Sequence, residues 1–311
     1  MLHVLSVTGP IYLIILVGYV AVRCGVFEKI ELRVIGRFVM QFCLPALLFD
    51  AVSRRQLGEL LNAPFLAAYA GGSLFAFACG FLYAKRVRRS SLTLAALQGL
   101  GSSASNSGFI GYPVAMQVIG PMAGAAAALT IAIENLIMLP LAFALIEADG
   151  SGGWREGVKA SLQALVRNPL VIAIVAGVLC AAFEWQPPSV IARTMQIGGA
   201  AGGPAALFVI GGSLVGLKLG GIRSEIARVT ATKLILHPLA VGALLALLPP
   251  FDPELRQAAL LFAAMPMMSM LPVLAQEHGH EGLFAATLLA ATVCSFFTIS
   301  AALWLIGVGA H

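Results

Sequence analysis

Residues 101–117 read GSSASNSGFIGYPVAMQ, a polar run that interrupts a long apolar segment. The apolar flanks favour a membrane helix, whereas the serines, asparagine, glycines and proline in the middle disfavour a continuous one. In hydrocarbon every backbone N–H and C=O needs a partner, so a broken helix is stable only where protein or a water-filled cavity surrounds the break. Broken helices near the bilayer midplane form the binding sites of many membrane carriers. The stretch therefore predicts a binding site at a helix break.

The composition of the whole chain indicates an all-α polytopic membrane protein. Of its 311 residues, 59% are hydrophobic and 11% are charged, whereas soluble domains carry about 25% charged residues. So little polar surface cannot cover a soluble globule of this size, so apolar side chains must face lipid. The formal charge of +5 comes from basic residues in short loops, which membrane topology explains. We expect a lipid bilayer as a partner and no nucleic acid.

Ten apolar segments are long enough to cross a hydrocarbon core about 30 Å thick. They cover residues 8–23, 34–52, 63–84, 93–119, 121–146, 168–184, 190–217, 229–248, 258–277 and 282–308. An even number places both termini on one side. The loops on the side of the termini hold only Arg54, Arg55, Arg193 and Arg256. The loops on the opposite side hold the other basic residues, namely Arg23, Lys29, Arg33, Arg37, Lys85, Arg86, Arg88, Arg89, Arg155, Lys159, Arg167, Lys218, Arg223, Arg228 and Lys233. The positive-inside rule predicts a multi-pass protein of the cell (inner) membrane with both termini on the non-cytoplasmic side.

A shift of 159 residues relates the two halves of the chain. It superposes three pairs of prolines, Pro10 on Pro169, Pro45 on Pro204 and Pro113 on Pro272. Residues 1–150 and residues 160–311 then hold five segments each, and an odd number makes the second half enter the membrane from the opposite face. We therefore expect two inverted five-helix repeats, an architecture common among alternating-access carriers.

The ninth segment carries a second interruption. Residues 263–277 read AAMPMMSMLPVLAQE, with Pro266 and Pro272 inside an apolar segment. A proline removes a backbone donor and clashes with the carbonyl four residues earlier. Under the same shift, Asn106 and Ser107 coincide with Met265 and Pro266. Segments four and nine are thus expected to break at equivalent places and to cross.

Several motifs, in their order and spacing, resemble the auxin efflux carrier family, including its bacterial branch of malonate transporters. They are Asn106-x6-Pro113 ending in Gly111-Tyr112-Pro113, Leu44-Pro45-Ala-Leu-Leu-Phe49, the glycine-rich Gly202 to Leu214, Lys233-Leu-Ile-Leu-His-Pro238, and the paired prolines of segment nine. The resemblance covers the whole chain. It implies a fold similar to that of the sodium/bile-acid symporters, with segments 1, 2, 6 and 7 as a scaffold and segments 3–5 and 8–10 as a transport domain.

The resemblance also implies a substrate class and a binding site. Family members carry organic anions, and in the plant carriers an asparagine at the position of Asn106 helps to bind the substrate carboxylate. That asparagine commonly follows a proline, whereas Ser105 precedes it here. The residues expected to bind substrate are Ser105, Asn106, Ser107, Pro266, Met267 and Ser269, and those expected to shape the crossing are Gly111, Pro113, Pro266 and Pro272. The alternative for the polar residues is that they satisfy one another across packed helices.

Glu134, Asn135 and His237 are candidates for coupling transport to an ion. Glu134 is the one carboxylate well inside a predicted segment, where a charge costs at least about 2.5 kcal/mol on insertion scales. His237 lies about one turn inside segment eight, near the interface, and histidine titrates near neutral pH. A structural hydrogen-bonding role is the alternative for each. Coupling to protons, to sodium or to neither stays open, although sodium ligands are few, with Asn106, Asn135, Gln98 and Gln117 as helpers.

The expected activity is secondary active transport of small carboxylates by an elevator movement. The chain has no G-x-x-x-x-G-K-[ST], H-E-x-x-H or G-x-S-x-G motif, which disfavours an ATP-driven pump and an enzyme. A channel-like uniporter or a substrate-sensing receptor of the same fold is the alternative. We expect no cofactor and no metal site. Gly212, Gly216 and Gly220 permit close packing within the chain or a homodimer.

Overall fold

The computed structural model describes residues 2–55, 62–148, 163, 166–216 and 223–306. These residues form helices and no β-strand, and each of the ten predicted segments contains helix. The predicted boundary between the two repeats, near residues 150–160, lies outside the described residues, as does Gly220.

Five continuous helices in the described ranges are long and apolar enough to cross a membrane. They are Lys29–Ser53, Ala63–Val87, Met122–Glu147, Arg223–Leu247 and Glu281–Leu305, and the shorter apolar helices are Gly9–Arg23, Ser107–Ile119 and Pro169–Ala182. Large apolar side chains such as Phe183, Phe297 and Trp304 are more than two-thirds exposed on the surface, as lipid-facing residues would be. The protein is therefore a multi-pass membrane protein.

Four of these long helices contain a wide π turn. The turns are η1 (Val39–Cys43) between α2 (Lys29–Phe38) and α3 (Leu44–Ser53), η2 (Tyr83–Val87) after α5 (Ala63–Leu82), η4 (Glu134–Met138) between α8 (Met122–Ile133) and α9 (Leu139–Glu147), and η5 (Thr232–Leu236) between α13 (Arg223–Ala231) and α14 (His237–Leu247). Three of them end two residues before a proline, namely Pro45, Pro140 or Pro238. Because proline crowds the carbonyl one turn earlier, the wider turn lets the helix continue through it.

Two other segments are broken, as the sequence predicted. The first consists of α6 (Leu92–Ser103), the extended residue Ala104, the π turn η3 (Ser107–Gly111) and α7 (Tyr112–Ile119). The second consists of α15 (Pro253–Ala263) and α16 (Leu271–Gln276), separated by residues 264–270. We call these two interruptions the first break and the second break.

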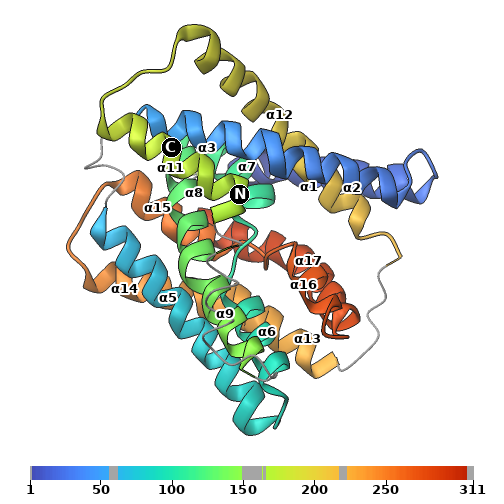
Figure 1. Cartoon of the computed structure of the whole chain (residues 1–311). Coiled ribbons are helices and arrows are strands. Elements are labelled where there is room, and N and C mark those ends of the chain that lie inside the picture. The colour runs from blue at the N-terminus through green and yellow to red at the C-terminus, as the bar shows by residue number, and fades with distance from the viewer. Residues whose placement is uncertain (1, 56–61, 149–162, 164–165, 217–222, 307–311) are drawn as a thin grey trace.

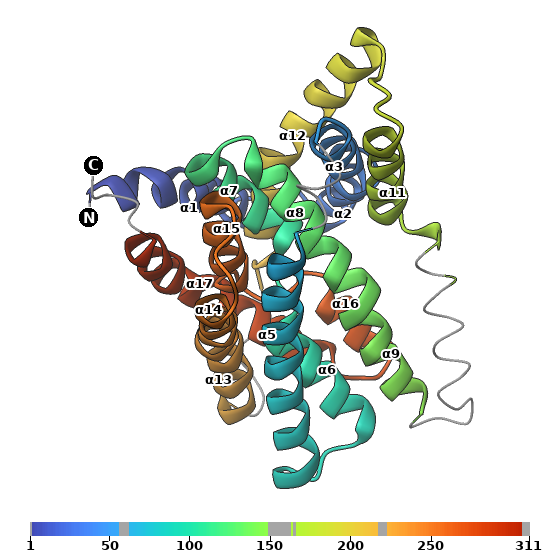
Figure 2. The same cartoon turned by 90° about the vertical axis from the view of Figure 1, so that its left-hand side faces the viewer.

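The helices pack in two groups, which Figures 1 and 2 show from two sides. In the first group α1 (Leu2–Arg23) lies along α12 (Ser189–Ser213), and α3 packs against α12 and α11 (Pro169–Ala182). In the second group α5 packs against α6 and α14, and α17 (Glu281–Leu305) packs against α13 and α16. The groups meet where α3 packs on α8 and α12 on η3. The first group contains predicted segments 1, 2, 6 and 7.

Glycines permit the closest helix contacts in the first group. A Cβ on Gly18 of α1 would overlap the backbone of Phe208 in α12, and a Cβ on Gly211 of α12 would overlap the backbone of Ile15. Gly212 in turn faces the Leu32 side chain. The described part of the glycine-rich segment therefore contributes to packing within one chain.

One sequence prediction for segment eight is wrong. The helix over this segment begins at Arg223 rather than at residue 229. Lys233, which we counted among the loop residues, lies inside this helix and is fully buried. His237, which we expected near the interface, is fully buried among other side chains. The polar start of this helix is accommodated because other helices supply partners: Arg228 donates to the Gln98 side chain and lies 4.5 Å from the centroid of the Tyr83 ring.

Candidate functional site

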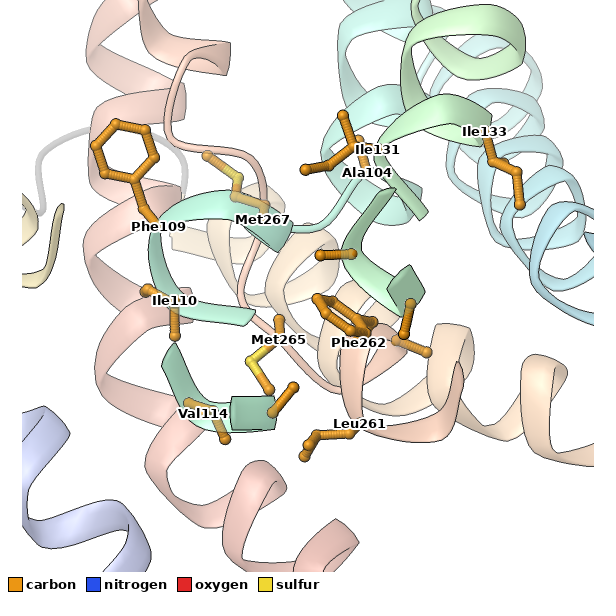
Figure 3. Packing of buried hydrophobic residues seen from close by; sticks show 14 of the residues in the cluster. Ala104, Phe109, Ile110, Val114, Ile131, Ile133, Leu261, Phe262, Met265 and Met267 are labelled. Carbon is orange, nitrogen blue, oxygen red and sulfur yellow. The ribbon is translucent and has the colours of Figure 1, made fainter. Parts of the chain in front are cut away.

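The two breaks lie against each other and are joined by backbone hydrogen bonds. Ser105 and Met267 form an antiparallel β-bridge. Its bonds run from Asn106 N to the Pro266 carbonyl (2.8 Å) and from Met268 N to the Ala104 carbonyl (3.0 Å). Figure 3 shows the extended segment with Met265 and Met267 passing the turn that carries Phe109 and Ile110. The bridge satisfies backbone groups that hydrocarbon would leave unpaired.

Glu134 stabilises the first break. Its Oε1 accepts hydrogen bonds from Ser105 N at 2.9 Å, from Ser107 Oγ at 2.8 Å and from the Tyr69 hydroxyl at 3.5 Å. The residue begins η4 and is 3% exposed. A negative charge at this point also complements the N-terminal end of the half-helix formed by η3 and α7. A proline at position 105 would have no N–H to donate to this carboxylate.

Lys233 stabilises the second break. Its Nζ donates to the carbonyl oxygens of Ala263 and Met265, both at 2.8 Å, and to His237 Nδ1 at 3.1 Å. These carbonyls lie at and just beyond the C-terminal end of α15, where the helix dipole favours a positive charge. Sequence reasoning missed this residue because it counted basic residues for topology. The available signal was the four-residue spacing to His237, which puts both side chains on one helix face.

Two residues of α5 connect the two charged groups. His237 Nε2 lies 2.9 Å from Ser73 Oγ. Because Nδ1 accepts from the lysine, we assign the proton to Nε2, which then donates to Ser73. One turn away, the Tyr69 ring packs edge-on against His237 at 5.6 Å between centroids, and its hydroxyl donates to Ser105 Oγ at 3.2 Å. A continuous buried polar cluster therefore runs from the first break to the second.

A cavity of about 280 Å³ opens beside the first break. Both packing groups contribute to it, since Met40 and Leu44 come from the first group and Met268 from the second break. Four predicted binding residues line it, namely Ser105, Asn106, Ser107 and Ser269, together with Glu134 and Asn135. Pro266 and Met267 do not line it: the Pro266 carbonyl belongs to the bridge and the Met267 side chain is fully buried.

Asn106 brings an unused amide to this cavity. The residue is 3% exposed, and its Nδ2 has no hydrogen-bond partner within the described ranges. A buried donor without a partner costs about 1–3 kcal/mol. The backbone of Asn106 is held on both sides, because its N–H donates to Pro266 and its carbonyl accepts from Ile110 and Gly111. Asn106 is therefore a cavity-lining residue whose buried amide nitrogen is left without a hydrogen-bond partner in the described part of the chain.

Asn135 is fixed by a bond that crosses between the two packing groups. Its Oδ1 accepts from Asn168 Nδ2 at 2.7 Å, and its own Nδ2 donates to the Ile131 carbonyl at 2.8 Å. Asn168 is also the N-cap of α11, since its Oδ1 accepts from Leu170 N at 2.9 Å. Sequence reasoning missed Asn168 because an asparagine before a proline reads as an ordinary helix start.

The residues predicted to shape the crossing have structural roles at the helix ends. A Cβ on Gly111 would lie 2.7 Å from Cε1 of Phe262, so only glycine fits there. Pro113 and Pro272 occupy the second positions of α7 and α16. A helix start tolerates proline because the missing N–H has no partner within the helix.

The proposed sodium helpers are not gathered in one place. The side chain of Gln98 accepts from Arg228, and exposed Gln117 donates to the Pro113 carbonyl of its own helix. The part of the chain that the structure describes contains no group of three His, Cys, Asp or Glu side chains arranged to hold a metal ion. Asn106 and Asn135 are the two amides of that set that line the cavity.

Comparison with known proteins gives consistent results along almost the whole chain. The family profile described as "Membrane transport protein" matches residues 3–305. The chain is 30% identical over 311 residues to the "Putative malonate transporter" of Rhizobium meliloti (strain 1021), which covers 98% of this chain and 97% of that protein. It is 26% identical over 240 residues to the "Uncharacterized transporter YfdV" of Escherichia coli (strain K12), which covers 75% of each chain.

Proposed function

Because the chain belongs to the membrane transport protein family of the auxin efflux carriers, we propose that it is a secondary active transporter of small carboxylates across the cytoplasmic membrane. The first substrate to test is malonate, the compound in the name of the Rhizobium relative. In this proposal both termini lie on the non-cytoplasmic side, and ten spans form two inverted repeats. The family and both relatives are named as transporters, which favours transport over an enzymatic activity.

The observation that carries the proposal is the free amide of Asn106 at the cavity beside the first break. An amide donates well to a carboxylate oxygen, because hydrogen bonds to charged groups are stronger than those between neutral groups. Ser269 also lines the cavity and offers a second donor. The remaining wall is largely apolar, which suits a short carbon chain between carboxylates.

The proposed movement carries the second packing group, with both breaks, past the first group. The bridge between Ser105 and Met267 makes the two breaks one unit. Small residues lie where the groups meet: a Cβ on Gly108 would lie 2.8 Å from a methyl group of Leu44, and Gly203 lies beside Pro113. An interface of small side chains has low relief, which suits the sliding of an elevator mechanism.

Binding and uptake of radiolabelled malonate by proteoliposomes containing the purified chain test the proposal. Uptake should saturate with concentration, as for a carrier and unlike a channel. Asn106→Ala removes the amide; since such a bond is worth about 1.5–3 kcal/mol, malonate Kd should rise by about 10- to 150-fold. Gln117→Ala is the matched control, because it removes an exposed amide of the same broken segment. Unchanged affinity in Asn106→Ala would contradict the proposed site.

A further inference from the structure

Lys233 brings a positive charge to a place where cation-coupled carriers bind an ion. In such carriers, unwound backbone carbonyls and the C-terminal ends of half-helices coordinate sodium or receive protons. Here two carbonyls at the second break, those of Ala263 and Met265, are 2.8 Å from the Lys233 ammonium. We propose that Lys233 is a tethered cation of the crossing: its ammonium occupies the position of a coupling sodium ion, so that transport requires no sodium. This inference rests on the proposed transport function.

The hydrogen bonds of Lys233 match an ammonium group completely. The group has three N–H donors, and they are directed at the Ala263 carbonyl, the Met265 carbonyl and His237 Nδ1. His237 is itself held by Ser73, which fixes the acceptor nitrogen toward the lysine. Oxygen atoms that would be sodium ligands are thus already occupied by a cation that belongs to the chain.

The charge of Lys233 is balanced within the same cluster. Glu134 is the acidic group that interacts electrostatically with it, and both side chains are buried. The two hold opposite breaks: Glu134 accepts from the first, and Lys233 donates to the second. A buried charge left without its partner is strongly destabilising. Removing the ammonium therefore leaves a vacancy beside the Ala263 and Met265 carbonyls and His237 Nδ1, which a small external cation can fill.

Two roles for Lys233 predict different results: in the first its side chain only fills space, and in the second its ammonium acts as a tethered cation. In the first case, loss of the side chain lowers stability whatever salt is present. In the second, a truncated side chain makes the protein sensitive to the identity of the cation. Lys233→Ala opens the vacancy, whereas Lys233→Met removes the charge but keeps most of the volume. Lys85→Ala is the matched control, because Lys85 lies in the π turn η2 but is exposed.

Thermal unfolding of the purified protein, at one ionic strength in choline, sodium or methylammonium chloride, tests this inference. We expect Lys233→Ala to have a lower Tm than wild type in choline and to recover part of it in sodium or methylammonium, since a ligand that binds the native state raises its stability. Lys233→Met should show a lower Tm without such recovery. Wild type and Lys85→Ala should unfold at the same temperature in all three salts.

Two results would overturn the inference. One is a Lys233→Ala variant whose Tm does not depend on the cation. The other, which needs no variant and decides the matter if Lys233→Ala does not fold, is sodium-dependent malonate binding or uptake by wild type. The thermal measurements contain no organic anion. Cation recovery without malonate binding would therefore refute the proposed substrate alone, and malonate binding without cation recovery would refute the tethered cation alone.

Discussion

The residues at the two breaks differ in how readily the sequence alone identifies them as candidate site residues. Asn106 stands out because an amide beside glycines and a proline is unusual inside an apolar segment. Lys233 and Asn168 do not stand out, because each fits a common pattern. Lys233 reads as a basic residue near a helix end, and Asn168 reads as an N-cap. Their partners, the carbonyls of the second break and the side chain of Asn135, come from distant parts of the chain. Such pairings depend on the packing and cannot be read from local sequence.

Glu134→Gln should remove the pH dependence of malonate uptake. Glutamine retains an oxygen acceptor for Ser105 N and Ser107 Oγ but cannot ionise. In wild type, an ionised Glu134 repels an anion in the adjoining cavity, and a protonated one does not. Wild-type uptake should therefore fall as the pH rises, while uptake by the variant should stay level.

Uptake measured in proteoliposomes from acid to alkaline pH checks this prediction. Glu147→Gln is the control, because Glu147 lies at the exposed end of the same continuous helix. If Glu134→Gln keeps the pH dependence of wild type, proton coupling does not run through this carboxylate.

At the scale of helices, proline alone did not distinguish a break from a continuous span. The helices with Pro45, Pro140 and Pro238 continue because a π turn precedes each proline. At Pro266 the helix stays open, because other groups take the carbonyls of residues 262–266. The donors are Ser105 Oγ, Lys233 Nζ, Thr298 Oγ1 and Asn106 N. The sequence therefore predicted where the second break lies, while the reason for its stability depends on three other parts of the chain.

Gly111→Ala should destabilise the first break. The new Cβ would lie 2.7 Å from Cε1 of Phe262, which is fully buried and cannot swing away. Overpacking of this kind costs about 1–3 kcal/mol, so the Tm of the variant should fall. Gly242→Ala in α14 serves as the control: its Cβ would lie 3.6 Å from Leu260, an ordinary contact, and alanine favours a helix interior over glycine. Equal stability of the two variants would argue against the tight contact at Gly111.

For the molecule as a whole, hydropathy predicted the apolar segments well, because each needs only local composition. The division into two packing groups depends on which helix faces meet. That information lies partly in glycines such as Gly18 and Gly211, whose contacts are long-range and were not predicted. The bond from Asn168 to Asn135 is of the same kind and has a consequence for movement, since it joins α11 of the first group to η4 of the second.

Asn168→Asp should weaken the conformation seen here. Aspartate caps a helix as well as asparagine does, so α11 keeps its start. It lacks the N–H donor, however, and places an oxygen against Asn135 Oδ1. The expected result is a larger population of a second arrangement of the two groups.

Spin labels at Leu136→Cys and Val175→Cys in a cysteine-free background, both at exposed positions, measure this change as a new distance between η4 and α11. Asn62→Asp, which alters the N-cap of α5, is the control and should leave the distances unchanged. A single distance distribution common to Asn168→Asp and wild type would show that this bond does not hold the two groups in place.

The buried Glu134 and Lys233 also have an electrical consequence. Both belong to the second packing group and would travel together, so their opposite charges cancel while the site is empty. If Glu134 takes up a proton when a monoanion enters, the sum stays at zero in the loaded state as well. Moving one uncompensated charge across a membrane voltage of about 100 mV changes its energy by about 2.3 kcal/mol. Neither the empty state nor the loaded state carries an uncompensated charge. The singly protonated form of a dicarboxylate would thus cross in both directions without opposition from the voltage.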